Sequence, residues 1–474
     1  MRAEEYESYD AVGLAGLIER GEVTASELLD AALERTAACN PTLNAVVIPM
    51  EEHARAAIAG GLPIGPFHGV PFLIKDLALQ ITGVRTSNGC RLFRDHVADH
   101  DSELVRRYAK AGLVTFGRTA SPEFGLTTTT ESTLFGPTRN PWNHDHTSGG
   151  SSGGASAAVA AGIVPLANAS DGGGSIRIPA SCCGLFGLKP TRGRTPFGPD
   201  AGEGWSGMST VHAVSRSVRD SAALLDASEG PEIGSPYWAP PKARPYIDDV
   251  SRAPAPLRIA MLTETFNGTP THPHCVDAVE AAGKLCESLG HRVEATKIAI
   301  DRAALGSASQ TIMGSNLIAT LEDRAAKLGR EFGPDDVEPF SWMTIQGARQ
   351  RTATDYARAI RVIHSIGRTI DAHLGRYDVI LSPTMAAPPE RIGVLSLANP
   401  DLAAMVPAVL RSVGFTQVFN ASGHPAMSVP LHWSPDGLPI GVQFAGRFSD
   451  EGTLFRLAGQ LEAAKPWWDA RPPR

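Results

Sequence analysis

The sequence lacks the features that mark several classes of protein. It has no run of 18 apolar residues, about the length that a membrane-spanning helix requires. Its first residues do not show the basic stretch followed by an apolar stretch of a secretory signal peptide. Lys and Arg number 43 against 50 Asp and Glu, so no basic footprint for nucleic acid is present. We therefore expect a cytoplasmic protein that binds neither a membrane nor nucleic acid, and whose substrate is not a polyanion.

Cysteine is also scarce, and metal-ligand patterns are missing. The chain has six cysteines, none of them in C-x-x-C spacing, which favours buried reduced thiols over a disulfide framework. The pairs His144 with His146 and His272 with His274 lie in segments flanked by proline, without a Cys or Glu partner at ligand spacing. We expect neither a metal site nor a cofactor.

The overall composition is that of a folded globular protein. Hydrophobic residues make up 42% and charged residues 20% of the chain, which excludes global disorder. A length of 474 residues exceeds the usual range of one domain, so either a large core with appended segments or two domains is expected.

Strands and helices are expected to alternate along the chain, which predicts an α/β fold with a large mixed β-sheet covered by helices on both faces. Thr24 and Glu27 form the pattern of a capping box at the start of a helix. Residues 235–256 are rich in proline and predict a surface excursion or a boundary. Residues 305–374 predict long helices, broken near 329–339, that form a lid over the site. The expected helices are 11–39 (as two), 102–111 and 274–290, and the expected strands are 44–48, 70–74, 114–116 and 257–262.

Two glycine-rich segments contain the residues that indicate catalysis. Residues 149–154 read GGSSGG, and residues 171–177 read DGGGSIR. Glycines that precede a serine let several backbone N–H groups face one point, where they can stabilise an oxyanion beside an attacking hydroxyl. The pattern indicates an acyl-transfer site.

Two other interpretations of these segments are open. Gly-Ser stretches often form flexible linkers, although the flanking segments 155–161 and 163–167 are typical of ordered, buried elements. Residues 149–153 also match G-x-S-x-G, the nucleophile elbow of α/β-hydrolases, which would make Ser151 the nucleophile of an esterase. An elbow follows a hydrophobic strand, whereas residues 140–148 are polar and contain proline.

The segment 147–194 resembles the signature of the amidase signature family. It carries GGSSGG, DGGGSIR and GLKPT, and further similar motifs are FGPTRNPW at 135–142, DVILSPT at 378–384, NASGHPAMSVP at 420–430 and GLPIGVQ at 437–443. The resemblance covers nearly the whole chain. It implies the amidase signature fold as a single domain over 1–474, with a catalytic core at about 65–200 and a lid or accessory helical segment at about 300–375.

The resemblance also implies a Ser-cis-Ser-Lys triad and its roles. Ser175 is the expected nucleophile, Ser151 the bridging serine and Lys75, at the end of VPFLIK, the base. A lysine becomes a useful base at neutral pH only when burial lowers its pKa, and the five apolar residues before Lys75 predict that burial. The expected oxyanion donors are the N–H groups of Gly172, Gly173, Gly174 and Ser175.

Other residues are assigned to supporting roles. We expect Asp171 and Arg177 to brace the glycine loop rather than to clamp a substrate. By resemblance, Gly125, Leu126 and Thr127 run beside the nucleophile and shape the acyl site. Residues at helical spacing on the covering segment face the same pocket; these are Ile312, Met313 and Asn316.

Within the family, the overall pattern is similar to the group of 6-aminohexanoate cyclic-dimer hydrolases. That similarity implies hydrolysis of small uncharged amides, whether linear, aryl or cyclic, and of carbamates (urethanes), by a monomer or homodimer. The chain departs from the family pattern at Ala169-Ser170 and at Gly172. The main alternative is a glutaminase like the amide-cleaving subunit of glutamyl-tRNA amidotransferase, although residues 323–352 differ from the segments expected there. A non-catalytic binding protein would require loss of a triad residue, and all three are present.

Overall fold

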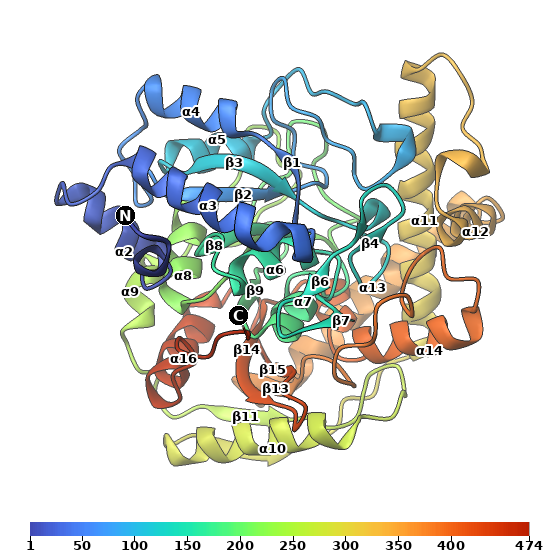
Figure 1. Ribbon diagram of the computed structural model, residues 1–474. Coiled ribbons are helices and arrows are strands. Elements are labelled where there is room, and N and C mark those ends of the chain that lie inside the picture. The colour runs from blue at the N-terminus through green and yellow to red at the C-terminus, as the bar shows by residue number, and fades with distance from the viewer. Residues whose placement is uncertain (474) are drawn as a thin grey trace.

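The computed structural model describes residues 1–473, and its N-terminal part follows the expected pattern (Figure 1). Helices α2 (Ala11–Glu19) and α3 (Ala25–Leu43) are the two helices expected from residue 11 onward, and α3 extends a few residues past the expected end. Thr24 Oγ1 accepts from the Glu27 N–H, and the Glu27 carboxylate accepts from the Thr24 N–H at 2.8 Å. The capping box that the sequence predicted is therefore confirmed.

Within residues 1–473, 11 strands form one mixed sheet. Neighbouring strands pair in parallel at β3–β2, β2–β8, β13–β11 and β11–β12, and the other pairs are antiparallel. In spatial order the strands are β1 (Val46–Pro49), β3 (Val114–Thr119), β2 (Pro71–Lys75), β8 (Leu166–Asp171), β10 (Thr210–Ser215), β9 (Phe186–Lys189), β14 (Ala426–Trp433), β15 (Pro439–Gly446), β13 (Val379–Pro383), β11 (Arg258–Met261) and β12 (Arg292–Ala295).

Helices surround this sheet, and two short strand pairs lie outside it (Figure 1). The pairs are β4 (Glu131–Ser132) with β5 (Gly136–Pro137), and β6 (Arg139–Asn140) with β7 (Asn143–Thr147). The other helices are α1 (Ala3–Tyr6), α4 (Glu51–Ala59), α5 (Glu103–Lys110), α6 (Gly153–Ala160), α7 (Arg177–Cys183), α8 (Val218–Ser228), α9 (Tyr246–Val250), α10 (Pro273–Ser288), α11 (Arg302–Lys327), α12 (Pro339–Ala348), α13 (Ala353–Leu374), α14 (Leu402–Val413), α15 (Gln417–Ser422) and α16 (Glu451–Ala464), with 3₁₀ turns at Arg91–Phe93, Glu123–Gly125 and Pro334–Asp336.

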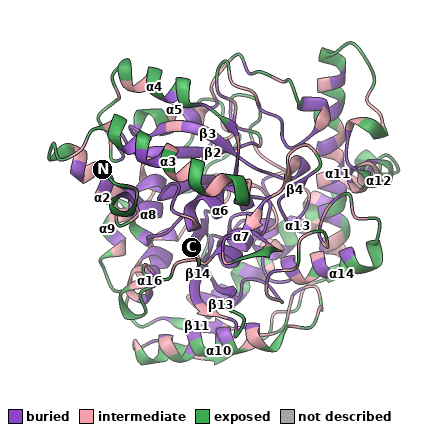
Figure 2. Ribbon diagram, viewed as in Figure 1, coloured by how far each residue is buried: buried purple, intermediate pink, exposed green. Residues whose placement is uncertain are grey.

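Both faces of the sheet are covered, as predicted. Successive side chains of a strand point to opposite faces, so consecutive residues of β15 contact the helices that cover the two faces of the sheet. Val442 and Phe444 pack in a cluster with α8, α10 and α16, whereas Ala445 packs in another with α11, α13 and α15. The inner strands of the sheet are buried, whereas the edge strand β12 and the outer helix faces are largely exposed (Figure 2).

The proline-rich segment 235–256 is only partly a surface excursion. Trp238 is 61% exposed, but Tyr246 is buried and begins α9, which packs on α8 and α16. Residues 305–374 form α11, α12 and α13, with the break at 328–338. Helix α11 packs along α13 and against α12; a lid role for them stays a prediction. No helix in the described part of the chain is long and apolar enough to cross a membrane.

Candidate active site

The predicted base lies at an edge where two parallel strands end. Lys75 is the last residue of β2 and Asp171 the last of β8, and these strands are parallel neighbours. Because the carboxyl ends of parallel neighbours meet at one edge, the residues at and just after these ends are brought together. Ser151 and Ser152 reach the same edge from the loop before α6.

Three serine hydroxyls surround the Lys75 amine. Lys75 Nζ donates to Ser151 Oγ at 2.7 Å, to Ser152 Oγ at 2.9 Å and to Ser170 Oγ at 3.0 Å. Lys75 is 1% exposed and Ser151 2% exposed. The structure therefore brings together two of the predicted triad residues, Lys75 and Ser151.

The buried amine has an altered acidity. Burial disfavours the ammonium and lowers the pKa of Lys75 to about 7, although the nearby Asp171 carboxylate acts in the opposite direction. A large share of the Lys75 side chains is then neutral near pH 7. Such an amine can accept a proton from the Ser151 hydroxyl, whereas an ordinary lysine cannot.

The GGSSGG segment is neither a linker nor a nucleophile elbow. The Gly150–Ser151 peptide bond is cis, and a Cβ on Gly150 would lie 2.3 Å from the Thr129 carbonyl oxygen. A backbone packed so closely against its neighbour is ordered, so the linker interpretation is wrong. The strand before Ser151 is β7, which belongs to a separate two-stranded pair and not to the central sheet. The elbow interpretation is therefore also wrong.

Ser175 lies in the loop between β8 and α7, and a buried carboxylate organises that loop. Asp171 Oδ1 accepts from the N–H of Gly174 at 2.8 Å, and Oδ2 accepts from the N–H of Ile176 at 3.1 Å. Arg177 contacts the same carboxylate with two parallel bonds, Nε to Oδ2 at 2.9 Å and Nη2 to Oδ1 at 2.8 Å. The prediction that Asp171 and Arg177 brace the loop is confirmed.

The electrostatic state of Asp171 follows from this pairing. Burial alone would raise its pKa, but the Arg177 guanidinium and the hydrogen bonds outweigh burial and hold the pKa of the Asp171 carboxyl well below its usual range. The remaining Arg177 donors reach the C-terminal part of the chain, namely Thr416 O, Gln443 Oε1 and Asn420 Oδ1.

The loop hydrogen bonds narrow the set of oxyanion donors. Because the Gly174 N–H is donated to Asp171, it cannot also serve an oxyanion in this conformation. Gly172 and Gly173 are half-buried, and Ser175 keeps 9% of its surface exposed. The donors available from the predicted set are thus the N–H groups of Gly172, Gly173 and Ser175.

The segment that was expected beside the nucleophile lies against Ser151. Gly125 has φ +68, and a Cβ on it would lie 2.9 Å from Ser151 Oγ. Leu126 is half-buried and packs toward α11 and α12. Thr127 is buried, and its hydroxyl donates to Leu395 O at 2.8 Å, so this side chain anchors the loop.

The three residues predicted on α11 have different environments. Ile312 is fully buried in the core with Met208, and its place in the acyl pocket stays a prediction. Met313 is half-buried. Asn316 Nδ2 donates to Ile312 O at 2.8 Å and lies 3.4 Å from Tyr356 Oη.

Sequence reasoning missed several partners of the predicted residues. Ser152 and Ser170 both accept hydrogen bonds from Lys75, and Asn420 Nδ2 donates to Asp171 Oδ1 at 2.8 Å. The only signal for Ser170 was its place in a departure from the family pattern. Asn420 stands at the start of a motif, yet nothing in its local sequence links it to a carboxylate far away in the chain.

The first stability prediction concerns the buried ion pair. Arg177→Met would leave the Asp171 carboxylate buried without its charged partner, so we expect the free energy of unfolding to fall by about 3–5 kcal/mol. The surface pair Arg358–Asp355 provides the control, since Arg358→Met should cost no more than about 1 kcal/mol. Urea denaturation of both variants tests this. Equal midpoints for the two would contradict the bracing role.

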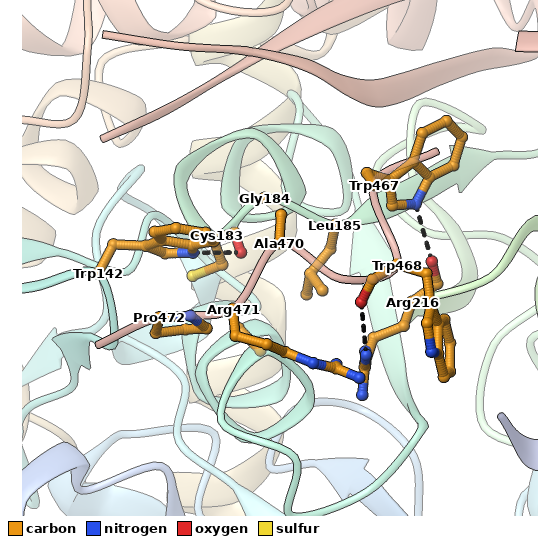
Figure 3. Close-up of a pocket in the computed structure, with 11 residues that line it drawn as sticks. Trp142, Cys183, Gly184, Leu185, Arg216, Trp467, Trp468, Ala470, Arg471 and Pro472 are labelled. Carbon is orange, nitrogen blue, oxygen red and sulfur yellow. Dashed lines mark hydrogen bonds between the residues drawn. The ribbon is translucent and has the colours of Figure 1, made fainter. Parts of the chain in front are cut away.

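A separate hollow lies where the C-terminal segment packs over the end of α7 (Figure 3). Trp142 Nε1 donates to Cys183 O at 2.9 Å, and Trp467 Nε1 donates to Arg216 O at 2.9 Å. Arg216 also lies over the Trp468 ring, 3.9 Å from its centroid. The lining contains no predicted site residue, and the contacts of Trp467 and Trp468 with Arg216 hold the C-terminal segment against the core.

Thiols and metal-ligating groups add nothing to the site. All six cysteines are free, and all but Cys39 are buried, which confirms the expectation of buried reduced thiols for the other five. Over residues 1–473, no three or more His, Cys, Asp or Glu side chains are grouped as metal ligands would be.

The comparisons with known proteins agree with this geometry. The Amidase family model matches residues 27–455. The chain is 39% identical to a 6-aminohexanoate-cyclic-dimer hydrolase of Paenarthrobacter ureafaciens, over 98% of this chain and 96% of that protein. A solved structure of 6-aminohexanoate cyclic dimer hydrolase superposes with a TM-score of 0.93 at 38% identity, covering 98% and 99% of the two chains. The solved structure of a bacterial aryl acylamidase of the amidase signature family superposes with a TM-score of 0.89 at 27% identity, covering 98% of this chain and 99% of that chain. The chain therefore belongs to the amidase family and is an amide-cleaving hydrolase.

Proposed function

We propose that this protein hydrolyses small uncharged amides through an acyl-enzyme on Ser175, with Ser151 as the proton relay and Lys75 as the base. The observation that carries the proposal is the buried Lys75 amine, 2.7 Å from Ser151 Oγ and with its pKa lowered to about 7. A neutral amine in that position supplies the base that a serine hydroxyl needs in order to attack near pH 7.

Acylation begins with two linked proton transfers. The Lys75 amine takes the proton of Ser151 Oγ while Ser151 takes the proton of Ser175 Oγ. The Ser175 oxygen bonds to the carbonyl carbon, and the electron pair of the C=O bond moves to its oxygen. The N–H groups of Gly172, Gly173 and Ser175 stabilise that oxyanion, the largest single contribution in many such sites.

The leaving group requires the same relay in reverse. An amide anion is too basic to depart, so the nitrogen must receive a proton as the C–N bond breaks. The Lys75 ammonium returns a proton to Ser151, and Ser151 passes its own proton to the nitrogen. A water molecule then loses a proton to the relay and attacks the acyl carbon. As the bond to Ser175 Oγ breaks, the relay returns that proton to Oγ, and the carboxylic acid product is released. The residues present complete the cycle without a cofactor.

The chemical character of the site favours uncharged substrates. The buried Asp171 carboxylate is paired with Arg177, and burial lowers the pKa of Lys75 to about 7, so a large share of this amine is neutral near pH 7. The half-buried Leu126 follows Gly125, which lies against Ser151, and packs toward α11, on which Met313 is half-buried. Amides with apolar acyl or amine groups fit these surroundings, and a carbamate presents the same carbonyl with an alkoxy group. Cleavage of urethanes by a monomer or homodimer is part of this proposal.

Hydrolysis by the purified protein of an anilide, a cyclic diamide, a carbamate, an ester and glutamine tests the proposal. We expect the anilide to be cleaved with release of aniline, the cyclic diamide to be opened to a linear product with a free amino end, or both, and glutamine to be cleaved poorly. Preferred release of ammonia from glutamine would instead support the glutaminase alternative. Cleavage of the ester alone would contradict amide hydrolysis.

The pocket prediction for α11 is tested with Met313. If this half-buried side chain shapes the acyl site, Met313→Ala will change the ratio of kcat/KM between a bulky and a small amide by about 10-fold. The pH profile will stay the same, because the change affects shape and not proton transfer. Equal proportional losses for both amides, together with a lower Tm, would assign Met313 to core packing.

A further inference from the structure

The turn between Gly204 and Ser209 has an unusual backbone. Three successive residues have positive φ: Trp205 at 51°, Ser206 at 54° and Gly207 at 77°. This region suits glycine, and a bulky residue such as tryptophan rarely occupies it. Such conformations persist where the surrounding structure over-determines them, and they are concentrated at functional sites.

Several contacts hold this turn. Arg192 Nε donates to Gly207 O at 2.7 Å, and the hydroxyl groups of Ser206 and Tyr356 lie 2.6 Å apart. Asn420 Nδ2 donates to Met208 O at 3.1 Å and also to the Asp171 backbone oxygen at 2.9 Å. The same amide group therefore connects the turn with the residue that organises the Ser175 loop.

The turn places an indole directly against the glycine loop. A Cβ on Gly172 would lie 2.6 Å from Cζ3 and 2.7 Å from Cε3 of Trp205, closer than any real Cβ contact. The indole can thus occupy its position only because residue 172 has no side chain. Trp205 packs against the cluster that contains Met208 and is only half-buried, so the residue keeps some accessible surface beside the glycine loop of the proposed oxyanion site.

We propose that Trp205 determines substrate specificity by forming an apolar wall beside the scissile carbonyl. The inference rests on the proposed function, because it places the carbonyl oxygen at the N–H groups of Gly172, Gly173 and Ser175. A flat aryl ring or a methylene chain attached to that carbonyl group lies against the accessible part of the indole. Aromatic and aliphatic groups gain dispersion and hydrophobic contact there, which a single methyl group cannot match.

The first test compares an anilide of a long acyl chain with the acetyl anilide. Trp205→Ala should lower the ratio of their kcat/KM values by at least ~10-fold, because only the larger substrate loses the contact. Trp205→Phe should give an intermediate ratio. Tyr356→Phe removes the hydroxyl that holds Ser206 and should shift the ratio in the same direction, which keeps the test informative if Trp205→Ala folds poorly.

The second test uses the absent Cβ. Gly172→Ala introduces a methyl group into the indole, which must displace the oxyanion loop, so kcat/KM should fall by ~100-fold for both anilides. Removing the indole opens space for that methyl group. On the acetyl anilide, which does not use the indole contact, the double variant Gly172→Ala/Trp205→Ala should therefore regain at least ~10-fold over Gly172→Ala, a coupling that independent sites would not show.

Trp238 provides the matched control. Trp238→Ala removes an exposed indole from the same part of the chain and should leave both anilides unaffected. An unchanged kcat/KM ratio in the Trp205 and Tyr356 variants, or no recovery of kcat/KM in the double variant, would refute the role of Trp205. Either result would leave the proposed amide hydrolysis standing. If the unmodified enzyme shows no hydrolysis that depends on Ser175, the proposed function itself fails and the inference fails with it. A shifted ratio with recovery in the double variant supports the proposal.

Discussion

Ser175→Ala is expected to abolish turnover of every amide and to prevent formation of any covalent acyl adduct. The reason is chemical: without Oγ at this position, no nucleophile remains at the loop that carries the oxyanion donors. The contacts that hold the loop, from Asp171 to the N–H groups of Gly174 and Ile176, do not involve the Ser175 hydroxyl. The variant should therefore fold normally, and its loss of activity should not reflect a disordered site.

Mass spectrometry after treatment with an active-site acylating agent measures this directly. The unmodified enzyme should gain one acyl group and Ser175→Ala none. Ser151→Ala serves as the comparison, since it retains the nucleophile and loses the relay, so its acylation should be slow rather than absent. An adduct that persists on Ser175→Ala and disappears on Ser151→Ala would assign the nucleophile to Ser151 and refute the proposed triad.

Replacement of the base has the second largest expected effect. Lys75→Ala should reduce kcat/KM by at least ~100-fold, the usual scale of general acid–base catalysis. The variant removes the amine that contacts the hydroxyl groups of Ser151, Ser152 and Ser170. Steady-state kinetics at pH 8 measures the loss. A loss below ~10-fold would show that another group takes the proton.

The pH profile gives an independent measure of the same base. The active form of Lys75 is neutral, and burial lowers its pKa to about 7, so kcat/KM should rise from pH 6 and level off above pH 8. Lys189 is the control. Burial, the main cause, also lowers the pKa of Lys189 to about 7, but its Nζ donates to Pro190 O and not to a serine of the proposed triad. In Lys189→Met, kcat/KM should still fall as the pH drops from 8 to 6, because Lys75 is unchanged. A flat profile between pH 5 and 9, with chemistry rate-limiting, would argue against a lysine base.

Much of the fold could be predicted because its signals are local. A capping box such as Thr24 with Glu27 acts over one helical turn, and apolar runs such as residues 70–74 indicate a buried strand. The boundaries moved by a few residues, because helix ends depend on side chains that cap them. Tyr246 shows where this reasoning fails: a proline-rich segment predicts exposure, yet tertiary contacts bury that ring.

The pocket was harder to predict than the catalytic residues. The spacing of Ile312 and Met313 from Asn316, four and three residues further on, predicted side chains that face the pocket, but spacing alone cannot say which neighbour covers each residue. The core covers Ile312, and Met313 keeps an accessible surface. Trp205 had no sequence signal at all, because its position depends on a turn with positive φ and on the missing side chain of Gly172.

From the sequence alone, the alternation of expected strands and helices indicated the class of fold, and the motifs that resemble the amidase signature family indicated the family and the three residues of the proposed triad. Only the tertiary structure decided which groups surround them. Lys75 acquires its lowered pKa because the folded chain buries its amine, which contacts the hydroxyl groups of Ser151, Ser152 and Ser170. Asn420 reaches Asp171 across a separation of 249 residues. Desolvation and long-range contact exist only once the chain has packed, so no local pattern can encode them.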